Sequence, residues 1–235
     1  MTHDEFWTWM RGPLVNGLYT DEWYNGDPFT EAQKGYLGYH LRLVGGAQLR
    51  QLRVSNHSCL ERRFVHMTAV HNGQVLGKYD SKDGTCFDFF EESLADTEPF
   101  GPPANPSKYK HTSGLVQVDG LFGFGPSYGT GGYVVELPLD EVQGRAAVEE
   151  LFRDRWTDRG TRAVVVSFNL YNTNTRLVTV VRVLFEFFPD GHLVKSAKFF
   201  TVKMAMYQTA KDMVRHCVRR VLCTVVPTSH ALFTL

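Results

Sequence analysis

The chain has 235 residues, of which 43% are hydrophobic and 21% are charged, proportions typical of one globular domain of upper-middle size. Its 25 basic and 25 acidic residues cancel, which argues against a nucleic-acid-binding protein, because such a protein needs a strongly basic face to displace counterions from phosphate. No stretch approaches the roughly 18 consecutive apolar residues of a membrane-spanning helix, and the N-terminus lacks the basic region of a secretory signal. Composition alone therefore predicts a soluble chain.

The first predicted element is a helix at the N-terminus. Thr2 and Glu5 have the spacing of a capping box, and apolar residues then recur at helical spacing. The Gly12–Pro13 pair is expected to weaken or end this helix. An aromatic, turn-rich stretch follows, and the alternation of residues over 41–54 predicts a strand.

Residues 56–114 are polar, rich in glycine and closed by a proline cluster, which predicts a long irregular segment. Such a segment is uncommon in a compact domain unless it is functional or cross-linked. A disulfide between Cys59 and Cys86 would close a loop of about 28 residues and stabilise the fold by roughly 3 to 4 kcal/mol before strain is subtracted. Asn56 lies in an Asn-x-Ser sequon three residues before Cys59, a combination that favours an oxidising, extracytosolic compartment.

A short strand over Tyr133–Leu137 and then a helix are predicted after this segment. Asp140 and Gln143 have the spacing of a second capping box. Gly160 is predicted to end the helix in the left-handed conformation. The apolar positions expected on the packed face of the helix are Val148, Leu151, Phe152 and Trp156.

Three strands are predicted to complete the domain, within residues 163–172, 176–188 and 192–204, joined by turns at 172–175 and at Pro189–Gly191. The expected fold class is α+β: an antiparallel meander of about five strands packed against helices, with a disulfide-stapled loop excursion. In the middle strand, Arg182 and Glu186 are expected to point away from the packed face, which holds Leu177, Val181, Val183, Phe185 and Phe187.

No pattern associated with catalysis is complete. The stretch GFGPSYGTGG lacks the spacing of a nucleotide-binding loop, so it is interpreted as a structural turn. His66 and His71 are the closest histidine pair but have no third ligand nearby. Neither Cys59 nor Cys86 lies in the context of a catalytic nucleophile. We therefore expect a protein that is not an enzyme, with no catalytic residue, no metal site and no cofactor.

The charged cluster DRGTR, residues 158–162, can be interpreted as a recognition or active site, or as a structural element. The structural interpretation is favoured: the end of a helix, a glycine cap and a turn into a core strand, with basic residues beside the last helical carbonyls. In this interpretation Arg159 or Arg162 also forms a buried bidentate pair with an acid elsewhere in the chain.

Together these stretches resemble the polycystins, the cation-channel family named for polycystic kidney disease. The resemblance covers roughly residues 4–205 and is carried, in order, by DEFWTWMRGPLVNGLY, LVGGAQLRQLRV, NHSC, EPFGPP, YGTGGYVVEL, WTDRGTRAVVVSFNLYN and VVRVLFEFFPDG. Its signature residues in this sequence are Gly132, Tyr133, Trp156, Asp158, Arg159, Gly160 and Arg162.

The resemblance implies that residues 1–211 form the extracytosolic domain between the first and second transmembrane helices, on the extracellular or luminal side of a membrane such as that of the cilium. In the family, four such domains form a lid above the pore of a calcium-permeable, non-selective cation channel. The implied partners are other polycystin subunits, in a homo- or heterotetramer, and the pore region; calcium is implied only as the permeant ion. Cys59 and Cys86 match the family's disulfide pair, and Asn56 matches a glycosylation position.

The sequence departs from the family pattern at both ends. No transmembrane helix precedes Met1, and a divergent tail over residues 212–235, with Cys217 and Cys223, replaces the second one and is too short and too basic to span a membrane. We expect a truncated product or an incomplete gene model, from either a pore-forming or a receptor-like parent. The alternative from another class is a secreted or receptor-type, lectin-like module that binds ligands through its aromatic loops.

Overall fold

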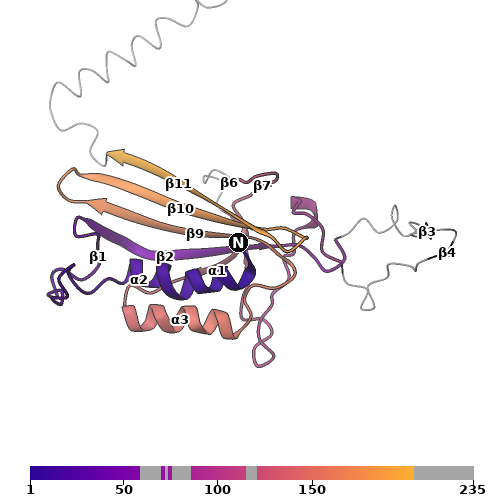
Figure 1. The fold of residues 1–235 in the computed structure, drawn as a ribbon, viewed down its shortest axis with the longest axis horizontal. Coiled ribbons are helices and arrows are strands. Elements are labelled where there is room, and N and C mark those ends of the chain that lie inside the picture. The colour runs from indigo at the N-terminus through magenta and orange to yellow at the C-terminus, as the bar shows by residue number, and fades with distance from the viewer. Residues whose placement is uncertain (59–69, 72–73, 76–85, 115–120, 204–235) are drawn as a thin grey trace, which may run out of the picture.

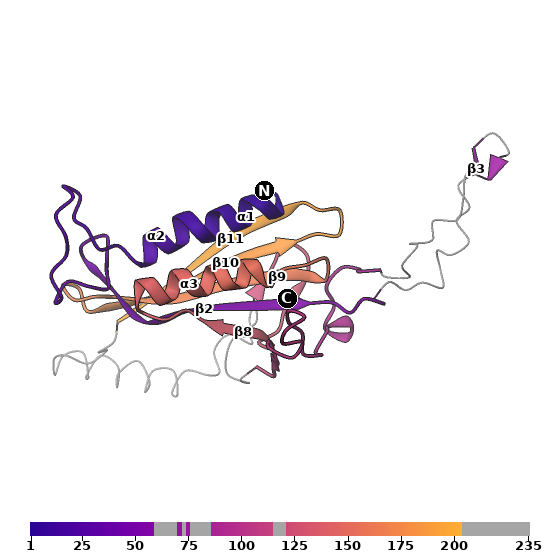
Figure 2. The same cartoon turned by 90° about the horizontal axis from the view of Figure 1, so that it is seen from below.

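The computed structural model describes residues 1–58, 70–71, 74–75, 86–114 and 121–203, and in this part of the chain a seven-stranded antiparallel sheet carries the helices on one face (Figures 1 and 2). The strands are ordered β11–β10–β9–β2–β8–β5, with β1 also paired to β2. Two small two-stranded sheets, β3–β4 and β6–β7, are not hydrogen-bonded to it as strands. The predicted α+β class is confirmed, whereas the boundary between residues 211 and 212 lies outside the described residues.

The elements have the following bounds. The helices are α1 (His3–Trp9), the π-helical turn η1 (Met10–Leu14), α2 (Val15–Leu18), the 3-10 turn η2 (Glu92–Leu94) and α3 (Glu141–Arg153). The strands are β1 (Tyr36–Leu37), β2 (Leu41–Arg53), β3 (Val70–His71), β4 (Gln74–Val75), β5 (His111–Thr112), β6 (Leu121–Phe122), β7 (Ser127–Tyr128), β8 (Gly132–Glu136), β9 (Thr161–Asn172), β10 (Leu177–Phe187) and β11 (Leu193–Lys203).

Only the last three strands form the predicted meander. The turn after Asn172 and the turn at Pro189–Gly191 join β9, β10 and β11 as expected. However, β2 pairs with β9 on one side and β8 on the other, so the centre of the sheet is built from segments more than 100 residues apart. Local turn signals cannot predict such a pairing, because it depends on tertiary packing.

The N-terminal helix has the predicted capping box, in which Thr2 and Glu5 exchange side-chain and backbone hydrogen bonds. The Gly12–Pro13 pair weakens this helix, as expected: the α-helical hydrogen bonding stops at Trp9, and the chain continues as the π-helical turn η1, which contains Gly12 and Pro13, and then as α2. A π-turn widens the backbone and so accommodates the missing N–H of proline. Burial of Met10 and Leu14 keeps this stretch packed against the sheet.

Two hydrophobic clusters lie on opposite faces of the sheet. The larger one lies between the sheet and the helices, and its members include Phe6, Met10, Leu49, Tyr133, Val148, Leu151, Trp156, Val164, Val166, Val181 and Phe185. The smaller one lies on the other face and is formed by Leu52, Val54, Phe90, Leu121, Tyr128, Ala163, Val165 and Leu184. Glu186 faces away from the helices, as predicted, but it is buried because this second cluster covers that end of the sheet.

Helix α3 begins at Asp140, whose carboxylate accepts a hydrogen bond from the backbone N–H of Gln143. The prediction that Gly160 ends the helix is wrong. Arg155 has the left-handed conformation, with φ of 52°. The N–H of Arg155 donates to the carbonyl of Phe152, and the N–H of Trp156 donates to that of Leu151, which together form a Schellman motif.

We expect Arg155→Gly to raise the free energy of unfolding by about 0.5–1 kcal/mol, because glycine adopts the left-handed conformation without a clash at Cβ. Urea denaturation measures the change. The matched control is Arg153→Gly, two residues earlier and still helical; it should lower the free energy of unfolding by about 1 kcal/mol. A loss of stability in both variants would refute the Schellman assignment.

Candidate functional site

Most of the predicted signature residues lie at one place, where β2 ends and β9 begins. There the N–H of Val54, just after β2, donates to the carbonyl of Gly160 at 2.9 Å. Trp156 lies fully buried beneath this point. The segment 86–98 crosses the same place on its way back from the long excursion. We call this meeting of three segments the junction.

Arg53, the last residue of β2, is the central cation of the junction. Its side chain is 9% exposed, and its Nη2 donates to Asp158 at 2.9 Å. A longer contact of 3.5 Å joins its Nε to Asp96. The guanidinium lies over the ring of Phe100, 4.0 Å from the centroid. Arg53 therefore joins the DRGTR turn to the segment 86–98.

Arg53 is not among the predicted signature residues, but the alternation of residues along β2 indicates that its side chain is buried. Leu49, Gln51 and Arg53 alternate along β2, and Leu49 is a core residue. Side chains two apart on a strand share a face, so Arg53 had to be directed toward the core. A buried guanidinium requires acids or carbonyls as partners. Only the fold shows that Asp96 and Asp158 supply them.

Arg162 is also buried, but the prediction that it or Arg159 pairs with a buried acid is wrong. Its guanidinium donates to four backbone carbonyls, at 2.7 to 2.9 Å, which are those of Phe87, Asp88, Arg159 and Thr161. Burial lowers the pKa of Arg162, and nearby carboxylates partly oppose this shift. Arg159 itself is exposed and lies over the ring of Phe87. Arg162 thus fastens the start of the segment 86–98 to β9.

The DRGTR turn is closed by its own side chains. Asp158 accepts hydrogen bonds from the N–H of Gly160 and from the hydroxyl of Thr161. Gln51, buried in β2, donates to Thr161 at 2.6 Å and to the carbonyl of Trp156 at 2.7 Å. A Cβ on Gly160 would lie 3.1 Å from the carbonyl of Val54 and 3.2 Å from the ring of Phe87. Any larger residue here would require these neighbours to shift by a few tenths of an ångström.

Tyr133 and Gly132, on β8, connect to the other end of the same segment. The hydroxyl of Tyr133 donates to the carbonyl of Glu98 at 2.6 Å and lies 3.2 Å from that of Asp96. Burial and the neighbouring Asp96 carboxylate raise the pKa of Tyr133. Gly132 has φ of 145°, and a Cβ there would lie 2.6 Å from the carbonyl of Gln51. Tyr133, Trp156, Asp158, Gly160 and Arg162 therefore lie at the junction, whereas Gly132 permits the close approach of β8 to Gln51 of β2, and Arg159 is exposed.

Asn56 and Cys86 lie side by side where the excursion leaves and rejoins the domain. The N–H of Cys86 donates to the carbonyl of Asn56 at 2.8 Å, and Asn56 is exposed. Ser58, the third residue of the sequon, accepts from the N–H of Asp88. Cys86 is disulfide-bonded. Cys59, Cys217 and Cys223 lie outside the described residues, so the pairing of Cys86 with Cys59 stays a prediction.

The glycine-rich loop between β6 and β7 holds a carboxylate of the chain itself. Both carboxylate oxygens of Glu186 accept from the N–H of Phe124, at 2.9 and 3.0 Å, and Tyr128 donates its hydroxyl to one of them. A Cβ on Gly123 would collide with this carboxylate. Burial, followed by Glu186, raises the pKa of Tyr128. The loop therefore has the structural role predicted for it.

In the described part of the chain, no group of three or more histidine, cysteine, aspartate or glutamate residues is arranged to hold a metal ion. A cavity of about 340 Å³ lies beside the junction and includes Arg53, Asp96, His111 and Tyr133 in its lining. Its charged groups bind one another and the backbone. The arrangement holds segments together and does not resemble a catalytic constellation.

Comparison with known proteins gives a consistent result. The family model described as Polycystin domain matches residues 1–205. Polycystin-2 of Danio rerio is 34% identical over 212 residues, covering 90% of this chain and 22% of that protein. Polycystin-2-like protein 2 of Mus musculus is 33% identical over 88% of this chain and 31% of its own length. The corresponding values for Polycystin-1-like protein 1 of Homo sapiens are 30%, 82% and 6%.

The chain thus spans less than a third of the length of each of these relatives. Among the residues that the structure describes, no helix has the length and apolar character needed to cross a membrane.

We expect Arg53→Met to lower the free energy of unfolding by about 2–3 kcal/mol, because it removes the cation between Asp96 and Asp158 and leaves polar groups without partners. The value is kept below that of a fully buried pair, because Asp158 is 42% exposed. Urea denaturation gives the change in stability.

The matched control for this experiment is Arg42→Met on the same strand, where the arginine is exposed; its effect should stay within about 0.5 kcal/mol. Combining Arg53→Met with Asp158→Asn should cost less than the sum of the single changes, since the two residues interact. Additive effects would show that the ion pair does not stabilise the junction.

Proposed function

This chain belongs to the polycystin family, and from this premise we propose that it is the extracytosolic domain of a polycystin-type, calcium-permeable, non-selective cation channel. In this proposal the domain is not an enzyme and acts in subunit assembly and gating above the pore. The observation that carries the proposal is the family match over residues 1–205, which includes every residue of the junction. The pore belongs to the remainder of the parent protein.

The geometry supports a mechanical role of this kind. A lid that transmits the position of one subunit to its neighbours must hold its projecting segments rigidly to its core. Arg53, whose carbonyl accepts from the N–H of Asp96 and whose Nε lies 3.5 Å from that carboxylate, fastens the segment 86–98 to β2, while Arg162 and Tyr133 fasten it to β9 and β8. A force on the excursion would therefore reach the sheet through buried, hydrogen-bonded contacts.

The features of an extracytosolic domain belong to the same proposal. We place the domain within residues 1–211, on the extracellular or luminal side of a membrane, with the ciliary membrane as one such location. The partner of Cys86 is Cys59, and Asn56 carries a glycan. The exposure of Asn56 beside the disulfide-bonded Cys86 supports both assignments. The partners are other polycystin subunits, in a homo- or heterotetramer.

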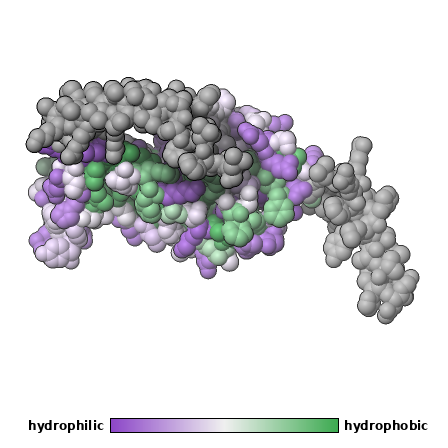
Figure 3. All heavy atoms as spheres, turned by 90° about the horizontal axis from the view of Figure 1, so that it is seen from above, coloured by the Kyte–Doolittle hydropathy of each residue, from purple (hydrophilic) through white to green (hydrophobic). Residues whose placement is uncertain are grey.

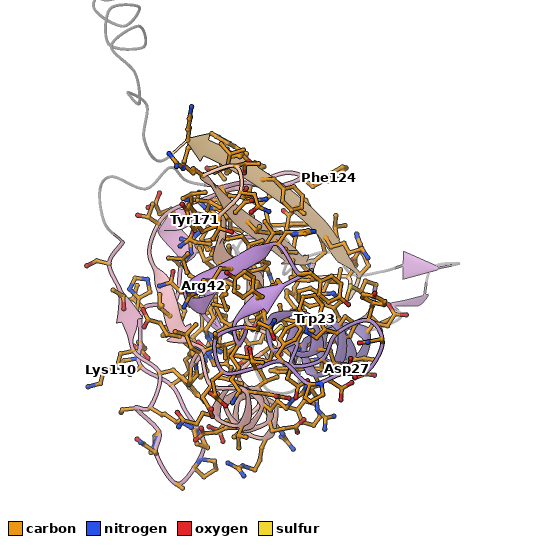
Figure 4. The ribbon with its side chains drawn as sticks, turned by 90° about the vertical axis from the view of Figure 1, so that its left-hand side faces the viewer. Trp23, Asp27, Arg42, Lys110, Phe124 and Tyr171 are labelled. Atoms are coloured by element: carbon orange, nitrogen blue, oxygen red, sulfur yellow. The ribbon has the colours of Figure 1, made fainter. Side chains whose placement is uncertain are left out.

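One observation favours the second candidate, a lectin-like binding module. A cavity of about 320 Å³ is lined by Trp23, Phe29, Tyr36 and Tyr39, together with the polar side chains of Gln33, His40, Thr173 and Asn174. Trp23 stacks on Tyr39 with ring centroids 4.9 Å apart, and Figure 4 shows Trp23 at the end of the molecule that holds this cavity. Aromatic rings with a few polar groups suit a small ligand. Saturable binding in a glycan screen, lost in Trp23→Ala, would favour this alternative.

The disulfide assignment has a direct test. When the full chain is produced in an oxidising compartment, peptide mapping under non-reducing conditions should recover one peptide pair joined through Cys59 and Cys86. The matched controls are Cys59→Ser, which should abolish the linked pair, and Cys217→Ser, which should leave it unchanged. Free thiols at Cys59 and Cys86 in folded protein would contradict the assignment.

The channel role is tested with a chimera. Residues 1–203 should replace the matching segment of Danio rerio Polycystin-2 without loss of tetramer formation, measured by native gel, or of cation current, measured by patch clamp. A chimera carrying Arg162→Gln should lose both, because four carbonyls of the junction lose their donor. The control Arg153→Gln, on the exposed surface of α3, should keep both. A wild-type chimera that folds yet fails to assemble would contradict the proposed role.

A further inference from the structure

Among the described residues, the face of the sheet opposite the helices is covered at one end only, and its open half is basic and apolar. Side chains two apart on each strand share this face, and the register of β2, β9, β10 and β11 aligns them across it. We call this half the basic face; its basic and apolar residues are Arg42, Val44, Arg50, Val178, Val180, Arg182, Lys198, Phe200 and Val202, and Ser167, Asn169 and Tyr171 of β9 lie between those of β2 and β10. An irregularity in β2 between Val44 and Gln48 preserves the alternation, so Arg42 and Arg50 point to the same side.

The basic face exposes large apolar side chains. Val44, Phe200 and Val202 are 47%, 49% and 56% exposed. Figure 3, which shows the molecule from above, has patches of hydrophobic and hydrophilic surface side by side on this side of the sheet. The guanidinium of Arg182 lies 5.7 Å from the ring centroid of Phe200. Contiguous apolar side chains ringed by charge are typical of an interaction surface.

The positive charges of this face lack acidic partners within the described residues. None of Arg42, Arg50, Arg182 and Lys198 takes part in an ion pair there. Burial, followed by repulsion from Arg182, lowers the pKa of Arg50 to about 10. The nearest acid in the strand register is Glu136, opposite Gln48 at the β8 edge. A partner that brings carboxylates would relieve this repulsion.

The complementary surface lies on the same chain. Residues 86–98 contain five acids, Asp88, Glu91, Glu92, Asp96 and Glu98, and no basic residue. Asp96 is used by Arg53, but Glu91, Glu92 and Glu98 are exposed. Phe89 projects among them and is 58% exposed. The junction fixes this acidic segment in place before any partner arrives, which reduces the entropy cost of binding.

Within one copy, the acidic segment lies over the covered end of this face, where Phe90 packs with Leu52 and Leu184, whereas Phe200 and Val202 at the open end stay exposed. In Figure 1 the acidic segment lies at the right-hand end, where the excursion leaves the domain, and β11 ends at the left. Figure 4 looks at that left-hand end and shows Arg42 and Tyr171 on neighbouring strands there. A contact between different surfaces of two copies leaves one of each surface free, so it repeats and closes into a ring when the rotation permits.

We propose that the acidic segment of one copy docks on the basic face of the next copy, with Phe89 packing against Phe200 and Val202. Glu91 and Glu92 then face Arg182 and Lys198 of the neighbour. The inference rests on the proposed function, since it names the surfaces through which the subunits assemble. The chain as a whole has no net charge, yet the acidic segment and the basic face carry charges of opposite sign.

Zero-length cross-linking tests the contact in the unmodified chain. A carbodiimide joins a carboxylate to an amine only when the two groups touch. The full chain is used at about 1 mM, the effective concentration that linked modules reach, with isotopically light and heavy copies mixed. We expect a light–heavy peptide pair that joins Glu91 or Glu92 to Lys198, and its loss in Lys198→Gln.

Charge reversal tests the same contact by sedimentation. Arg182→Glu alone, or Glu91→Lys with Glu92→Lys, should weaken association by about tenfold or more, because like charges then face each other. An equimolar mixture of the two variants should regain association, since each reversed segment meets a reversed face in an alternating ring. The matched control Arg153→Glu, on the exposed surface of α3 across the sheet, should associate as the unmodified chain does.

The possible results separate this inference from the function on which it rests. Association that is unchanged in both charge variants, or cross-linked only elsewhere, would overturn the docking surfaces and leave the assembly role standing. A chain that stays monomeric at this concentration would overturn the assembly role and the docking surfaces together. Restored association in the mixture, with the Lys198 cross-link, would support the proposed contact.

Discussion

A guanidinium buried at the end of a strand must find anions or carbonyls, and this requirement organises the end of the domain where β2 meets β9. Arg53 is matched by Asp158 and Asp96, and Arg162 by four backbone carbonyls. Each unmade bond would cost the desolvation of a charged donor, so the turn at 158–162 and the segment 86–98 have to lie where these donors reach them. The hydrogen bond from Tyr133 to Glu98 fixes the far end of that segment.

The same requirement explains the glycine-rich loop. The carboxylate of Glu186 is buried beneath it and accepts hydrogen bonds from Phe124 and Tyr128. The charged side chains of Arg53, Arg162 and Glu186 thus bind other groups of the chain itself. The acidic segment 86–98 and the basic face carry exposed charged side chains. Among the described residues, the buried atoms Gln51 Oε1, Arg53 Nη1 and Trp156 Nε1 have no hydrogen-bond partner, so the junction satisfies most but not all of its buried polar groups.

Local sequence patterns predicted the helices and strands well, and the ends of the helices less well. The capping bond of Thr2, the strands predicted from residues 41 and 163, and both hairpins after Asn172 are confirmed, although the second strand begins at Thr161. The expected left-handed Gly160 is wrong, and Gly12–Pro13 weakens the helix to a π-turn without ending the helical path. In both cases packing overrode a local preference: Arg155 accepts the strain because Trp156 must reach the core, and buried Met10 and Leu14 keep a proline-containing turn helical.

The sequence by itself determined the α+β class, the polycystin resemblance and the set of signature residues, because periodicity, capping residues and motif order are properties of neighbouring positions. Only the tertiary structure decided that Tyr133, Trp156, Asp158, Gly160 and Arg162 lie at one junction, that Arg53 is its central cation, and that Glu186 is held by the glycine-rich loop. Those facts depend on the pairing of β2 with β9 across more than 100 residues. No local signal encodes that pairing, because it results from burying both faces of the sheet and satisfying the polar groups enclosed there.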